Sequence, residues 1–160
     1  LTISNTSPLL YLHLVGHLEL LHQLYNEVIV PPAVKFELDQ GNKQGVEVPL
    51  VNKLPWIRIV PVQSRLLLPL VTDLGAGEIE VIGLALEHPG SRIIVDDQLG
   101  RYIAKLNGIT VTGTLGVVLK AKQAGFLSQV KPLVYKLKTA GLWLDNKLIE
   151  WVLGEANESM

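Results

Sequence analysis

Short apolar runs rich in β-branched residues alternate along this chain with longer segments of helical periodicity. The clearest run is Ile93–Val95, which contains no polar residue and is typical of a strand covered on both faces of a sheet. Val28–Val30 is similar, and Thr2–Ser4, Trp56–Val62 and Ile109–Thr112 complete the expected strands, with Pro61 indicating a strand end or a sheet edge. Strands that alternate with helices at this spacing predict an α/β/α sandwich around a mostly parallel sheet.

Helices are expected between these runs, because residues typical of helix ends stand at the right places. Pro8 predicts a helix with Thr6 or Ser7 as its N-cap, and Gly16 divides the periodic segment that follows into two short helices. Pro31-Pro32 opens the next helix, which we expect Gly41 to close. Further helices are expected at 78–87, 98–106, 115–124, 128–140 and 145–157.

Composition predicts a single domain over residues 1–160. A chain of 160 residues with 48% hydrophobic and 18% charged residues can bury a core and is not disordered. It has no cysteine, which excludes a disulfide scaffold, Cys-ligated zinc and a Cys nucleophile, and fits a cytoplasmic location. The apolar stretch Pro8–Leu24 is interrupted by polar residues, so we expect neither a membrane span nor a signal peptide.

Acidic residues gather near the expected strand ends. In open α/β sheets the working residues lie outside the carboxyl ends of the strands. Two adjacent carboxylates at the exit of a buried strand repel each other unless a cation lies between them. Oxygen ligands without Cys or a set of His suit Mg²⁺ or Mn²⁺, although each acid alone also has a structural explanation, such as pairing with a helix N-terminus. The candidates are Glu37, Glu78, Glu80, Asp96 and Asp97.

Five segments in this order resemble those of PIN domains, over about residues 2–157. They are I-S-N-T-S-P-L-L, V-I-V-P-P-A-V-K-F-E-L, L-G-A-G-E-I-E-V-I-G-L-A-L, I-I-V-D-D-Q-L-G-R-Y-I-A and G-I-T-V-T-G-T-L-G-V-V-L-K-A-K. The resemblance implies an α/β/α sandwich with an acidic cluster that binds Mg²⁺ or Mn²⁺. It also implies ribonuclease activity, since many members of the family act as ribonucleases, including toxins of toxin–antitoxin pairs.

The resemblance assigns site residues one by one. The family acids fall on Asn5, Glu37, Glu78 and Asp97, with Asp96 as a further candidate. We prefer Glu78 to Glu80, because Glu78 lies seven residues before Ala85 and so matches the family's spacing along that helix.

The start of the chain departs from the family pattern at its first acid. Asn5 keeps an oxygen ligand but lacks a negative charge, so we expect weaker metal binding. Thr6 and Ser7 match the small polar positions that follow, where a hydroxyl can hold a carboxylate or a water molecule.

The net charge of −1 hides an uneven distribution. Residues 1–97 hold eleven acidic and six basic residues, residues 98–144 hold seven basic residues and no acid, and the remainder holds four acids and one lysine. Lysines beside an acidic cluster suit a nuclease, since they neutralise phosphates, although they also suit ordinary solvated helix faces. Arg101 and Lys105, four apart on one expected helix, are the best candidates for RNA contact.

The resulting hypothesis is an Mg²⁺- or Mn²⁺-dependent endoribonuclease that hydrolyses phosphodiesters, with RNA as substrate and a small antitoxin protein as partner. The alternative is a PIN fold of weak or no activity that binds RNA or a protein. The apolar helices expected over residues 9–24 carry Leu on nearly every side, which predicts a homodimer.

Overall fold

A computed structural model describes residues 1–65 and 73–159, and these residues form one five-stranded parallel sheet. The strand order is β3-β2-β1-β4-β5, and every neighbouring pair is parallel. β3 therefore lies at a sheet edge and ends shortly before Pro61, as that proline predicts. The strands are β1 (Thr2–Ser4), β2 (Val28–Val30), β3 (Ile57–Ile59), β4 (Arg92–Ile94) and β5 (Thr110–Thr112).

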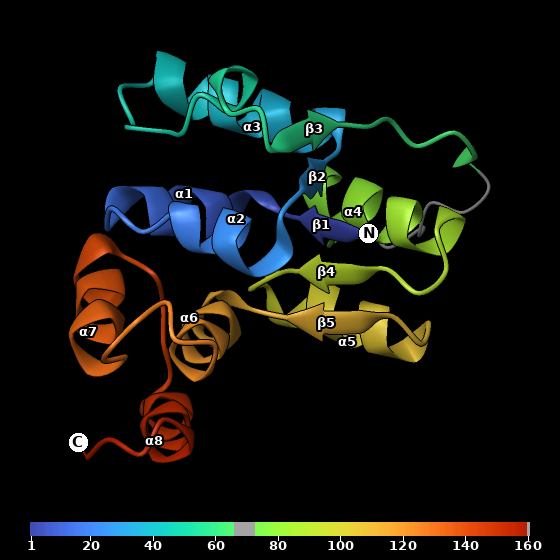
Figure 1. Ribbon diagram of the computed structural model, residues 1–160. Helices are drawn as coiled ribbons and strands as arrows, with labels where there is room; N and C mark the ends of the chain where they lie inside the picture. The colour runs from blue at the N-terminus through green and yellow to red at the C-terminus, as the bar shows by residue number, and fades with distance from the viewer. Residues whose placement is uncertain (66–72, 160) are drawn as a thin grey trace.

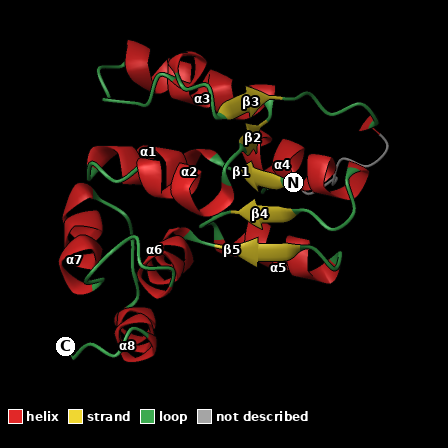
Figure 2. Ribbon diagram, in the orientation of Figure 1, coloured by secondary structure: helices red, strands yellow, loops and turns green. Residues whose placement is uncertain are grey.

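Helices cover both faces of this sheet. Figure 1 shows α1, α2, α6 and α7 grouped on one side of the strands and α4 and α5 on the other. Figure 2 shows the strands enclosed between these helices, which confirms the predicted α/β/α sandwich. The helices are α1 (Thr6–Leu14), α2 (Glu19–Tyr25), α3 (Pro32–Lys43), α4 (Ala76–Glu87), α5 (Gln98–Leu106), α6 (Thr114–Gln123), α7 (Lys131–Ala140) and α8 (Asn146–Glu155), with a 3-10 turn at Val51–Lys53.

The central strands are buried because their side chains are apolar on both faces. Val28–Val30 is at most 1% exposed, and Ile93, Ile94 and Val95 are fully buried. In β1, Ile3 pairs with Ile29 on one side and Ile93 on the other. These residues form the centre of the core, so the uninterrupted apolar runs are explained by helices on both faces. Within the described residues, no helix is long and apolar enough to span a bilayer.

The ends of two helices differ from the prediction. Asn5, rather than Thr6 or Ser7, is the residue before the first helical turn, and its backbone is extended with φ −81° and ψ 177°. Gly41 does not end α3, which continues to Lys43. A Cβ at position 41 would lie 3.3 Å from a Val48 methyl, because the following loop packs closely back onto the helix at this glycine.

The strand order reverses between β1 and β4. From β1 the chain builds β2 and β3 to one side, and then returns to place β4 and β5 on the other side. At such a switch point the loops leaving two adjacent strands diverge and leave a crevice at their carboxyl ends. Asn5 follows β1, and Asp96 and Asp97 follow β4, so the topology brings them to one place.

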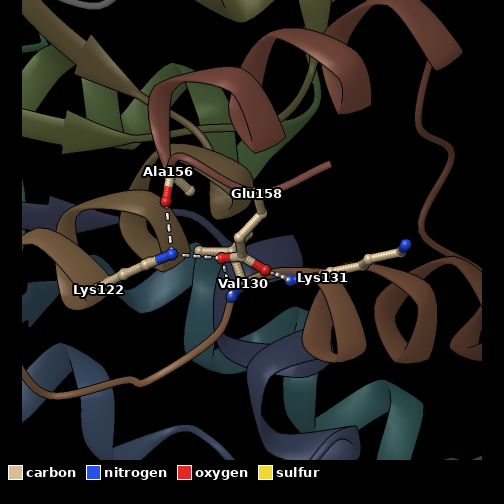
Figure 3. Close-up of polar contacts among 5 residues, drawn as sticks. All are labelled: Lys122, Val130, Lys131, Ala156 and Glu158. Carbon is tan, nitrogen blue, oxygen red and sulfur yellow. Dashed lines mark hydrogen bonds and ion pairs between the residues drawn. The ribbon is translucent and has the colours of Figure 1, made fainter. Parts of the chain in front are cut away.

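The Glu158 carboxylate connects the segment after α8 to the start of α7 and to α6 (Figure 3). Glu158 accepts hydrogen bonds from the backbone N–H groups of Val130 (2.7 Å) and Lys131 (3.0 Å) at the start of α7, and from the Lys122 ammonium (2.8 Å). Lys122 also donates to the carbonyl of Ala156. The Glu158 side chain is only 13% exposed, and although burial raises its pKa, these donors together hold the pKa below its ordinary value.

Replacing Glu158 with Gln is expected to lower the free energy of unfolding at neutral pH by about 1–3 kcal/mol, since hydrogen bonds to a charged acceptor are lost. A carboxylate with a lowered pKa contributes above its ordinary value of 4.5, and the contribution disappears as the pH falls through the folded-state pKa. Urea denaturation of parent and Glu158→Gln from about pH 7 to about pH 3 should therefore show a difference that shrinks in acid. The exposed Glu155→Gln is the control, and a difference that does not depend on pH would contradict the assignment.

Candidate active site

The chain leaving β1 places a buried polar side chain, Asn5, next to the end of β4. The Asn5 backbone N–H donates to the carbonyl of Ile94 (3.0 Å), which joins the carboxyl ends of β1 and β4. The Asn5 residue is 4% exposed, and its Oδ1 is buried without a hydrogen-bond partner. A buried acceptor left unpaired costs stability, so this oxygen is available to a ligand.

Glu37 is held beside Asn5 by two donors. Its carboxylate accepts from the Thr6 hydroxyl (2.6 Å) and from the Gly77 backbone N–H (2.9 Å). A Cβ at position 77 would lie 2.7 Å from both Asn5 Oδ1 and a Glu37 oxygen, so only glycine lets α4 begin so close to them. The start of α4, the middle of α3 and the end of β1 thus meet around these two oxygens.

The charged form of Glu78 is disfavoured by its surroundings. Burial raises the pKa of its half-buried carboxyl, and the charges of Glu37 and Asp97 raise it further. A hydrogen bond to its own backbone N–H and the nearby Asn5 amide oppose this rise without cancelling it. A carboxylate in such surroundings is stabilised by anything cationic that approaches it.

The adjacent aspartates have different surroundings. Asp96 accepts from the Ser7 hydroxyl (2.8 Å), the Thr114 N–H (2.7 Å) and the Thr114 hydroxyl (2.6 Å). Asp97 is exposed, and it caps α5 through the Gly100 N–H (2.8 Å). Asp96 is therefore occupied by protein donors, whereas Asp97 keeps acceptor capacity free on the side of Glu78.

Thr114 is the residue of this site that sequence reasoning missed. It is fully buried, and it begins α6 two residues after the end of β5. The segment T-G-T contributed to the family resemblance, but it received no role of its own. A polar residue at the carboxyl end of a strand, like Asn5 and Asp96, was the signal that could have found it.

Of the three remaining polar candidates, Thr6 and Ser7 lie at the site and Glu80 lies outside it. Thr6 and Ser7 each donate to a site carboxylate, Glu37 and Asp96 respectively. Glu80 instead accepts from the Ala33 backbone N–H (3.1 Å), so it stabilises the N-terminus of α3. This placement agrees with the choice of Glu78 over Glu80.

The two basic candidates lie on α5, which begins at this site. Arg101 is half-buried and donates from Nη1 to the carbonyl of Val95 (3.1 Å). A Cβ at position 113 would lie 3.0 Å from that nitrogen and 2.9 Å from Asp96 Oδ1, so the guanidinium is beside the acids. Lys105 is exposed one turn further from the site.

The donor set suits a hard cation. Within the described residues no three His, Asp or Glu side chains already converge as a complete metal site. The orphaned Asn5 oxygen and the mutual repulsion of Glu37, Glu78 and Asp97 nevertheless offer oxygen ligands and uncompensated negative charge. The residues present therefore fit Mg²⁺ or Mn²⁺ better than a softer metal.

Glu78→Gln is expected to stabilise the metal-free protein, raising its melting temperature at neutral pH by about 1–3 °C. The raised pKa means that the charged carboxylate costs stability above its ordinary value of 4.5, and that the cost vanishes below it. Thermal unfolding in a chelator should show the gain at neutral pH and none in acid. Glu150→Gln on the exposed side of α8 is the control, and a destabilised Glu78→Gln would show that the carboxylate is not strained.

Comparison with known proteins identifies the family of the chain. The sequence model of the family DUF3368, described as a PIN domain, matches residues 1–158. Searches of curated proteins and of solved structures gave no match. The matched region contains the whole sheet and every candidate site residue, and the PIN domain is a nuclease-type fold. The chain therefore belongs to the PIN-domain family.

Proposed function

We propose that this protein is a metal-dependent ribonuclease that hydrolyses phosphodiester bonds at the carboxyl ends of β1 and β4. The observation that carries the proposal is the cluster of Glu37, Glu78 and Asp97 around the unpaired Asn5 oxygen, at the switch point of a PIN-domain sheet. Burial and the charges of Glu37 and Asp97 raise the pKa of Glu78, and carboxylates that disfavour each other's charge in this way are typical of functional sites.

Glu78, Asp97 and Asn5 would hold Mg²⁺ or Mn²⁺, with Glu37 beside them. Such an ion, when bound, makes water more acidic and offsets the charge that develops on phosphorus. Glu37 is oriented by Thr6 and Gly77, so its role is to fix one side of the acidic cluster.

Arg101 and Lys105 would bind the phosphates on either side of the scissile bond. The Arg101 guanidinium is anchored by the Val95 carbonyl, which leaves its other N–H groups for a phosphate. The exposed position of Lys105 suits a contact with a neighbouring phosphate. A cytoplasmic location, a homodimer and neutralisation by a small antitoxin complete the proposal.

Mn²⁺-dependent cleavage of single-stranded RNA tests the assignment. Glu78→Gln and Asp97→Asn should each lower the turnover number by about a hundredfold or more, since they remove charge that acts in the transition state. Glu150→Gln should cleave like the parent. RNA binding without metal-dependent cleavage in the parent would instead support the alternative, a PIN fold that acts as a binding module.

Asn5→Asp extends the same test to the departure from the family pattern. A carboxylate at this position adds a negative charge, and we expect it to tighten Mn²⁺ binding by about tenfold. Unchanged Mn²⁺ affinity and rate would show that residue 5 does not face the ion.

The salt dependence of RNA binding tests the basic residues separately. Each phosphate contact to a single strand contributes about 0.7 to the slope of log affinity against log salt. Arg101→Gln and Lys105→Gln should each lower that slope by about this amount in a chelator, whereas the exposed Lys43→Gln should not. A slope near zero in the parent would contradict an electrostatic interface.

A further inference from the structure

Two cationic side chains meet one tyrosine ring at the amino edge of the sheet, away from the acidic cluster. The Arg92 guanidinium carbon lies 5.1 Å from the centroid of the Tyr25 ring, and the Lys120 ammonium lies 5.4 Å from it. The residues come from the start of β4, the end of α2 and the middle of α6. Three segments distant in sequence therefore bring two positive charges to one aromatic side chain.

These two charges are not balanced by acids. Within the described part of the chain, neither Arg92 nor Lys120 has a carboxylate within ion-pair distance. Burial lowers the pKa of Lys120, and the Arg92 charge lowers it further. Glu27 is near, but it pairs with Arg58 at 3.1 Å. Attraction to the ring offsets part of the repulsion between the cations, but it leaves a net positive site.

The hydroxyl of the same tyrosine is unpaired. Tyr25 Oη is buried and has no hydrogen-bond partner among the described residues. Burial raises the pKa of Tyr25, against a smaller lowering by Arg92, so the hydroxyl keeps its proton and can donate. Contact between the cations and the ring does not explain this group, because Phe would give the same ring without an unsatisfied hydroxyl.

A pocket of about 320 Å³ opens beside Tyr25 and Arg92, and the Lys120 ammonium reaches the same tyrosine ring from α6 without lining the pocket itself. Asp96 lies four positions after Arg92 along the extended chain, or roughly 13 Å at the usual rise of a strand, so the pocket is distinct from the acidic cluster. Its lining includes Thr2, Tyr25, Glu27, Gly90 and Arg92.

We propose that Arg92, Lys120 and the Tyr25 hydroxyl form a binding site for a phosphoryl group. Two positive charges and one neutral O–H donor suit a dianion with several acceptor oxygens. The phosphate can belong to an RNA backbone or to a small phosphorylated molecule, since both present the same oxygens. The site does not depend on the proposed ribonuclease activity.

Inorganic phosphate is the first probe. Thermal unfolding should show stabilisation of the parent by phosphate beyond that produced by chloride at equal ionic strength. Tyr25→Phe should weaken phosphate affinity by about tenfold while leaving the phosphate-free protein as stable as the parent or more so. Lys120→Gln should weaken it similarly, and Lys43→Gln should have no effect. Equal phosphate affinity in parent, Tyr25→Phe and Lys120→Gln, or no stabilisation beyond that of chloride, would overturn the proposal.

Two further ligands distinguish the sources of the phosphate. If the site binds RNA, Lys120→Gln should weaken binding of a single-stranded oligoribonucleotide in a chelator and lower its salt slope by about 0.7. If it binds a small molecule, adenosine monophosphate should compete with inorganic phosphate while oligoribonucleotide binding stays unchanged in Lys120→Gln. Competition by neither ligand would contradict the site, and the outcome is independent of whether Glu78→Gln abolishes cleavage.

Discussion

The Asp96 carboxylate is the interaction on which the geometry of the site depends. It accepts from Ser7 in α1 and from both the N–H and the hydroxyl of Thr114 in α6, so one side chain after β4 fixes the helices that follow β1 and β5. Three donors satisfy its oxygens without a cation. Asp97 is the next residue along the chain and caps α5, where its charge acts on Glu78.

Much of the fold could be predicted from local sequence. Val28–Val30 and Ile93–Val95 are apolar throughout because helices cover both faces of the sheet, and this burial is directly visible as a run without polar residues. The ends of the helices were harder to predict from the sequence. Gly41 is the example, since it lies inside α3 and packs closely against Val48 instead of ending the helix, and a contact across a loop leaves no local signature.

The candidate site could be predicted in its acids but not in its hydrogen bonds. The position of Glu78 followed from the family spacing, and the structure places it beside Glu37 and Asp97. The different surroundings of Asp96 and Asp97 could not be derived from the sequence. Thr114, which bonds Asp96, is eighteen residues away along the chain, and only the pairing of β4 with β5 brings the two together. Adjacent identical residues carry no information on which one meets the donors.

The location of a bound ion decides whether the acidic cluster is a metal site. Crystals grown or soaked with Mn²⁺ would reveal it by anomalous scattering, independently of any RNA substrate. We expect a peak at the carboxyl ends of β1 and β4, contacted by Glu78 and Asp97 and facing Asn5, with Asp96 still bound to Ser7 and Thr114. A site without a peak at saturating Mn²⁺, or an ion held by Asp96 away from Glu78, would contradict this expectation.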